Sequence, residues 1–242
     1  MLRLLILTFS LFSTSVFALG NQTNYSFNKA KKMLREIYKD HQLTFYCGCE
    51  YDEKLVNYKA CSYSPKKPSS KRAKRIEWEH IVPAYDFGRS FAEWREGHKD
   101  CVDRKGKKFK GRNCARKINK KFRLMESDMY NLVPEIGELN AIRSNHPITE
   151  VADTKQQLRG GCKTVFSGNA LKPRDEIKGF VARVYKYMDD AYPGHGIISK
   201  KNRKLFDAWD KQFPPTAWEI ERAKRIEKVQ KNSNKFVVAK TS

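Results

Sequence analysis

The stretch RIEWEHIVP, residues 75–83, decides how the central part of the chain folds. Its bulky side chains fall at every second position, which is the spacing of one face of a β-strand. Pro83 cannot continue a hydrogen-bonded ladder and therefore ends the run. The residues that share this predicted face are Ile76, Trp78, His80 and Val82.

Glu79 and His80 place a carboxylate beside an imidazole within this predicted strand. Neighbouring side chains of a regular strand point to opposite faces, so the two meet at one site only if the strand ends, bends or bulges there. A histidine on an apolar strand face is more often a packed core residue than a catalytic one. The pair alone is therefore weak evidence for a site.

A second stretch, ESDMYNLVPEIGELNAIRSNHP at 126–147, predicts a helix. Pro134 suits the first turn of a helix, and apolar residues at helical spacing continue from it as far as Arg143. Asn131 then lies at the entrance of this helix. We expect a two-stranded element that starts near Arg75 and leads into the helix.

The rest of the chain predicts mostly helices around this element. Apolar stripes indicate helices over Phe27–His41, near 177–188 and near 205–213, with Ser199 as a possible cap, and Thr216 begins a capping box for another. Short strands are expected at 43–47 and 163–166. With no internal repeat or linker, we predict one mixed α+β domain, flexible after about residue 232.

The first eighteen residues, MLRLLILTFSLFSTSVFA, have the pattern of a signal peptide. An early positive charge precedes an apolar stretch that ends in Val-Phe-Ala, so we expect cleavage after Ala18 and a mature domain over 19–242. The alternative is a membrane anchor, but the run is short and rich in Ser and Thr. We expect no stable insertion into a membrane.

Six cysteines agree with export, because an even number in an exported chain indicates disulfides. Six cysteines allow 15 connectivities. Two pairs would close short loops and leave the third: Cys49–Cys61, Cys101–Cys114 and Cys47–Cys162. A zinc site is the alternative, but the spacings lack repeated C-x-x-C.

The formal net charge of +22 indicates a polyanionic partner. Residues 104–123 contain eleven Lys or Arg and no acidic residue, and 66–75 is a second basic segment. A charge run is often only a solvated surface, but one this long and of one sign repels itself without a partner. Nucleic acid is the first candidate; charge alone also permits acidic polysaccharide or anionic lipid.

Several segments resemble the bacterial periplasmic endonuclease I family, a branch of the ββα-metal (His-Me finger) nucleases. They are RIEWEHIVPAYDFGR, GRNCA and KFRLMESDMYNLVPEIGELNAIRSN, followed by RVYKYMDDAY, LFDAWDKQFPPTAWE and ERAKRIEKVQKNSNKFV. The resemblance runs from about Leu34 to Val237, with the motifs in the same order. It implies a disulfide-stapled ββα-metal core wrapped by helices.

The resemblance also implies roles for individual residues. His80 would be the general base, and Glu79 and Asn131 would hold the metal, for which Mg²⁺ is expected and Mn²⁺ is the alternative. The family has an arginine just before the second cysteine of the middle pair. Arg112 is nearest to that place, although the spacing differs by one residue. Glu138, Asn140 and Arg143 form a second tier: the latter two could steer phosphate or support the waters of the metal.

This chain departs from the family at two places. Relatives often have a cysteine in a W-E-C-E-R segment, where this chain has Ile220, and no later cysteine follows. The basic stretch around Lys105–Lys110 is longer than expected, which would strengthen DNA binding.

The resemblance implies a periplasmic or secreted, monomeric endonuclease. It would cut DNA, and RNA is a second possible substrate, with little sequence preference and 5′-phosphate products. The main alternative is an exported nucleic-acid-binding protein that keeps the scaffold without the chemistry. Charge cannot separate the two, but a binding protein has no need of the EWEH and DMYN motifs. A protein for acidic glycans or membranes is the third possibility.

Overall fold

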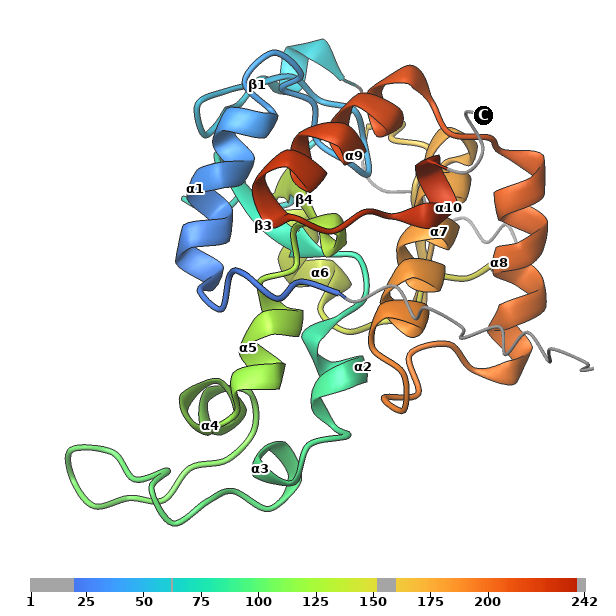
Figure 1. The fold of residues 1–242 in the computed structure, drawn as a ribbon. Helices are drawn as coiled ribbons and strands as arrows, with labels where there is room; N and C mark the ends of the chain where they lie inside the picture. The colour runs from blue at the N-terminus through green and yellow to red at the C-terminus, as the bar shows by residue number, and fades with distance from the viewer. Residues whose placement is uncertain (1–19, 62, 152–159, 239–242) are drawn as a thin grey trace, which may run out of the picture.

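The computed structural model describes residues 20–61, 63–151 and 160–238 (Figure 1). The predicted signal peptide, residues 1–18, lies outside the described residues. The helices are α1 (Phe27–Ile37), α2 (Ala84–Gly88), α3 (Ala92–Arg95), α4 (Arg112–Ile118), α5 (Lys120–Glu126), α6 (Gly137–Arg143), α7 (Asp175–Ala191), α8 (Lys200–Gln212), α9 (Ala217–Gln230) and α10 (Lys235–Val238), with 3-10 turns η1 (Tyr58–Ala60) and η2 (Met129–Asn131). The strands are β1 (Tyr51–Asp52), β2 (Leu55–Val56), β3 (Ile76–His80), β4 (Leu132–Ile136), β5 (Val165–Ser167) and β6 (Ala170–Lys172), paired antiparallel as β1–β2, β3–β4 and β5–β6. The prediction of a mixed α+β fold is confirmed.

The β3–β4 pair forms the centre of the molecule (Figure 1). In its register Glu79 lies opposite Val133, and His80 lies opposite Leu132. Every residue of β4 is buried, and Trp78 of β3 is buried. Helix α6 follows β4 directly and packs against both strands. The predicted strand is therefore confirmed, and it ends at His80.

The helix expected from Pro134 is wrong at its start. Residues 132–136 form β4, in which Pro134 lies opposite Trp78 and its carbonyl accepts a hydrogen bond from the Phe45 amide. A two-stranded sheet tolerates proline because its outer edge needs no amide donor. The helix begins at Gly137, where a Cβ atom would lie 2.7 Å from the Arg72 carbonyl oxygen. Only glycine lets the chain turn so close to its neighbour.

The helix predicted over Phe27–His41 is present as α1, which is capped by the Ser26 side chain and ends earlier than predicted, at Ile37. The strand predicted over 43–47 is wrong. This segment is a turn in which the Gly48 amide donates to the Thr44 carbonyl, and Gly48 has a φ of +67°. The positive φ that the turn requires suits glycine. The residues that the turn buries are the consecutive Thr44, Phe45 and Tyr46, whereas Leu43 is exposed, so the alternation does not match the burial.

The C-terminal helices follow the predicted stripes and caps. Ser199 caps α8, and the Thr216 hydroxyl accepts a hydrogen bond from the Glu219 amide at the start of α9. The Glu219 carboxylate binds buried Arg183 of α7. Helix α9 packs against α1, and α8 packs against α7. In Figure 1, α1 and α9 lie beside the central pair, and α7 lies between that pair and the outer helix α8.

The segment after residue 232, which we expected to be flexible, contains α10 as far as Val238. Val237 is buried, and its amide donates to the Asn234 carbonyl. The apolar residues Phe236–Val238 give this short helix a face to bury, although polar residues precede them in the sequence. Residues 239–242 lie outside the described residues.

All three predicted disulfide pairs are present: Cys47–Cys162, Cys49–Cys61 and Cys101–Cys114. The third closes the long basic loop between α3 and α4, which extends away from the body of the molecule (Figure 1). Within the described residues, no helix is long and apolar enough to cross a membrane.

Candidate active site

His80 ends β3 with its ring held in one orientation. Its Nε2 atom lies 2.8 Å from the carbonyl oxygen of Glu126. A carbonyl oxygen only accepts hydrogen bonds, so Nε2 carries the proton and the lone pair of the neutral ring is on Nδ1. Burial, and next the positive charge of Arg112, lower the pKa of His80 to about 3. The ring is therefore neutral at physiological pH, as a general base must be.

Glu79, the preceding residue, is a buried carboxylate with two donors. Its Oε1 atom accepts hydrogen bonds from Tyr46 Oη and Arg143 Nη1, each at 2.9 Å. Arg143 is completely buried and also donates to the carbonyls of His80 and Ile81. Burial raises the pKa of Glu79, and the Arg143 charge opposes that rise. Arg143 thus fixes both Glu79 and the end of β3.

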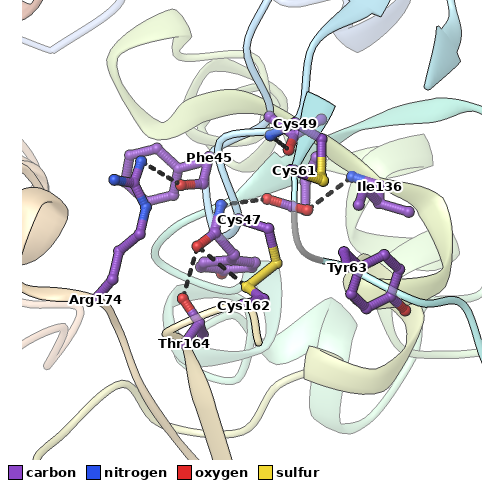
Figure 2. The surroundings of a disulfide bond; sticks show 12 residues. Phe45, Cys47, Cys49, Cys61, Tyr63, Ile136, Cys162, Thr164 and Arg174 are labelled. Carbon is purple, nitrogen blue, oxygen red and sulfur yellow. Dashed lines mark hydrogen bonds between the residues drawn. A yellow bond between two sulfur atoms is a disulfide. The ribbon is translucent and has the colours of Figure 1, made fainter. Parts of the chain in front are cut away.

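Two disulfides hold the turn from which Tyr46 reaches Glu79. Cys47–Cys162 and Cys49–Cys61 anchor this turn on two sides (Figure 2). The Tyr46 carbonyl accepts a hydrogen bond from the Thr164 hydroxyl at 2.7 Å. Because Tyr46 is separated from Glu79 by 33 residues, no spacing in the sequence identifies it.

Asn131, the expected metal ligand, does not have the environment of one. It is completely buried, and its carboxamide makes two hydrogen bonds with the backbone of Val82. Oδ1 accepts from the Val82 amide at 2.7 Å, and Nδ2 donates to the Val82 carbonyl at 2.9 Å. The oxygen that would bind a metal is therefore already used to tie η2 to the end of β3. We correct this assignment: Asn131 is a structural residue.

Asn140, which the sequence placed in the second tier, lies beside Glu79 and His80. Helix α6 brings it to the wall of a cavity of about 380 Å³ that Glu79, His80 and Arg112 also line. Its Nδ2 atom donates a hydrogen bond to the Glu77 carboxylate at 3.2 Å. This bond orients the carboxamide and does not use its Oδ1 atom. Asn140 thus shares a cavity with Glu79, and Asn145 lines the same cavity.

Arg112 also reaches this cavity and is held by Glu126. Arg112 Nε donates to Glu126 Oε1 at 2.6 Å, and Arg116 donates to both carboxylate oxygens. Burial alone would raise the pKa of Glu126, but the Arg116 hydrogen bond and the Arg112 charge outweigh it and lower that pKa. Glu126 therefore orients His80 with its backbone and Arg112 with its side chain. Neither contact follows from local spacing, so these roles of Glu126 could not be predicted from the sequence.

Glu138 is a structural anchor rather than a cavity residue. Its carboxylate accepts hydrogen bonds from Tyr63 Oη and from the amides of Lys66 and Lys67, at 2.6–3.0 Å. It thereby fixes the start of the basic segment 66–75 against α6.

A second cavity, of about 510 Å³, continues from the first and is strongly basic. His80, Arg112 and Asn140 line both cavities. The basic residues around the second cavity are Lys31, Arg35, Lys54, Arg72, Arg75 and Arg112. Burial, followed by the charges of Arg35, Arg116 and Arg112, lowers the pKa of Lys31. The pair of cavities is a groove suited to an anionic chain.

Comparison with known proteins identifies the family. The model of the Endonuclease I family matches residues 13–240. The chain belongs to the endonuclease I family. Similar relatives of this endonuclease I chain include an extracellular deoxyribonuclease of Aeromonas hydrophila, 41% identical over 88% of each chain. A periplasmic deoxyribonuclease of the same species is 37% identical over 89% of this chain and 86% of its own. Endonuclease-1 of Buchnera aphidicola subsp. Acyrthosiphon pisum (strain APS) is 37% identical over 89% of this chain and 82% of its own.

Proposed function

We propose that this chain is an exported endonuclease that hydrolyses phosphodiester bonds of DNA with little sequence preference and leaves 5′-phosphate ends. The observation that carries the proposal is one cavity that combines a neutral, oriented histidine with a carboxylate, an amide and an arginine. The names of the relatives support DNA as the substrate. RNA is the second substrate to test.

His80 would be the general base. Its Nδ1 lone pair accepts the proton of the attacking water, while Nε2 stays bound to the Glu126 carbonyl. Arg112 contributes to the low pKa of His80. A phosphate that enters beside Arg112 offsets that positive charge and makes His80 more basic when the substrate is bound. The pKa of His80 is thus higher when the substrate is bound, which is when His80 must accept the proton.

Arg112 would stabilise the phosphoryl group. Its Nε is engaged by Glu126, which leaves the terminal nitrogens to donate to phosphate oxygens. The side chain is about two-fifths exposed, at 38%, whereas Glu126 is 2% exposed. The guanidinium therefore faces the groove from a fixed support.

The donors in the cavity fit a hard divalent cation. Within the described residues, no group of three or more His, Cys, Asp and Glu could hold a metal, which argues against a zinc-type cage. Glu79 and Asn140 instead offer two oxygen donors, and Mg²⁺ is commonly held by few protein oxygens together with waters and phosphate. Mn²⁺ is an alternative. When bound, the cation would stabilise charge on the phosphoryl and departing 3′ oxygens.

The order of elements supports a ββα-metal core. Strand β3 carries Glu79 and His80, β4 pairs with it, and α6 carries Asn140 to the same cavity. We therefore assign β3, β4 and α6 to the two strands and the helix of that core.

The basic groove would bind the substrate through its phosphates. The segments 66–75 and 104–123 flank or line this groove, and phosphate contacts position a nucleic acid without identifying its sequence. This accounts for low sequence preference. Release of counterions then makes binding weaken steeply as salt rises.

Export is supported by the relatives and by the cysteines. Two of these relatives are named as extracellular or periplasmic enzymes, and disulfides persist in oxidising compartments. Three disulfides in one chain fit that environment.

The proposal is tested by digesting supercoiled plasmid and folded RNA with the mature protein in low salt. Cleavage with Mg²⁺ that stops on addition of EDTA is expected, with ends that a ligase joins without prior phosphorylation. Cleavage by His80→Ala would indicate a contaminating nuclease. His98→Ala, which replaces an exposed histidine, is the matched control. Plasmid that shifts on a gel but is not cut would support the binding-protein alternative.

A further inference from the structure

The cavity that contains Glu79 and His80 also has an aromatic wall. Tyr85 of α2 and Trp94 of α3 line it together with the proposed catalytic groups. Tyr85 is 44% exposed, which is unusual for a large ring beside a buried site. Its hydroxyl takes part in none of the hydrogen bonds found in the described part of the chain. The mechanism above gives this ring no role.

Neighbouring aromatic side chains hold the Tyr85 ring in place. Its ring meets Trp94 edge to face, with centroids 6.2 Å apart and an interplanar angle of 72°. Trp94 packs in turn on Phe122 and against Gly88, where a Cβ atom would lie 2.3 Å from the indole. Glycine at position 88 is therefore what allows the indole to support Tyr85. A ring that is ordered before binding loses little entropy when a ligand covers it.

The charges around Tyr85 indicate the chemistry of its ligand. The Arg89 guanidinium lies 5.9 Å from the centre of the Tyr85 ring, and Arg112 and Arg143 line the same cavity. The ligand is therefore expected to be a flat group attached to an anion. The volume of about 380 Å³ lies within the range of pockets for small ligands, about 300–1,000 Å³.

We propose that Tyr85 stacks on an unpaired nucleobase next to the phosphate that is cut. The inference rests on the proposed nuclease function, because it places the base in the cavity of His80. Both faces of a base in a duplex are covered by its neighbours, so only an unpaired base offers a face to Tyr85. Every base has such a face, so the contact does not select a sequence. It favours single-stranded substrates over a closed duplex.

The test compares cleavage of a single-stranded oligonucleotide with that of a hairpin duplex of the same sequence. Tyr85→Ala should lower kcat/KM on the single strand about 10- to 100-fold, the range expected for loss of one base–aromatic stack. Duplex cleavage should stay near the wild-type value. Tyr85→Phe keeps the ring and should retain both activities. Tyr25→Ala is the matched control, because Tyr25 is also exposed under an arginine but lines neither cavity.

Equal loss on both substrates, or no loss on either, would overturn the proposal. If Tyr85→Ala does not fold, the binding of His80→Ala to an abasic oligonucleotide replaces this test. Binding about 10-fold or more weaker than to the intact strand is expected, and equal binding overturns the stacking role. A wild-type protein that cuts neither substrate would instead refute the nuclease function itself.

Discussion

The Nε2–H group of His80 donates to the backbone carbonyl of Glu126 at 2.8 Å, while the carboxylate of Glu126 binds Arg112 at 2.6 Å. One residue at the end of α5 therefore orients both the proposed base and the proposed phosphate-binding arginine. A backbone contact survives substitution of the side chain, whereas an ion pair does not. The two roles can thus be separated by mutation.

Glu126→Gln should lower kcat/KM on DNA by about 10-fold or more, because a hydrogen bond to a charged partner contributes about 1.5–3 kcal/mol. The carbonyl that orients His80 remains, so the loss should come from a mobile Arg112. Steady-state kinetics measure it. Glu93→Gln is the matched control, since Glu93 accepts a hydrogen bond from Asn119 outside the cavities. Unchanged activity of Glu126→Gln would show that Arg112 needs no support.

Asn140→Ala and Asn131→Ala should fail in different ways. Asn140→Ala should lose Mg²⁺-dependent cleavage and show weaker Mg²⁺ binding by calorimetry, with its unfolding temperature nearly unchanged. Asn131→Ala should lose about 1–3 kcal/mol of stability, because it leaves the buried amide and carbonyl of Val82 without partners. Denaturant unfolding measures this loss. The reverse pattern would restore Asn131 as the ligand.

The basic groove predicts a salt dependence that single substitutions reduce. With His80→Ala as a non-cleaving background, log Kd for DNA should rise steeply with log salt. Lys54→Ala, in the groove, should weaken binding and lower the slope by about 1, as loss of one phosphate contact does. Lys224→Ala, on the exposed face of α9, should leave the slope unchanged. A flat salt response of the parent protein would contradict the groove.

Removing the Cys47–Cys162 disulfide should destabilise the protein more than removing Cys49–Cys61. The first joins residues 115 apart and the second joins residues 12 apart. Loop-closure entropy then predicts losses of about 4–5 and about 3 kcal/mol. Paired Cys→Ser variants compared by chemical denaturation measure the difference. A larger loss for the short loop would show that local strain or residual structure dominates over chain entropy.

Features of the fold that depend on local chemistry could be predicted from the sequence. The stripe of α1, the Ser199 and Thr216 caps and the strand at 76–80 all depend on residues a few positions apart. Pro134 misled the prediction because the same residue suits a helix start and an edge strand. Pairing with β3, which is a non-local interaction, decides between them.

That misplaced boundary also explains the wrong choice of asparagine. A helix that started at Pro134 would put Asn131 at its entrance. Because β4 occupies 132–136, the helix starts at Gly137 and carries Asn140 to the cavity instead. The contacts of Glu126 and Tyr46 with the site could not be predicted from sequence, since they join segments far apart in the chain.

In the proposed mechanism His80 takes the proton from the attacking water. Single-turnover cleavage of a labelled duplex by wild-type protein and by His80→Ala, each at saturating enzyme and Mg²⁺, tests this role most directly. We expect a rate about 10²- to 10⁴-fold lower for His80→Ala, with DNA affinity retained. Cleavage by His80→Ala at the wild-type rate would contradict it and remove the histidine from the chemistry.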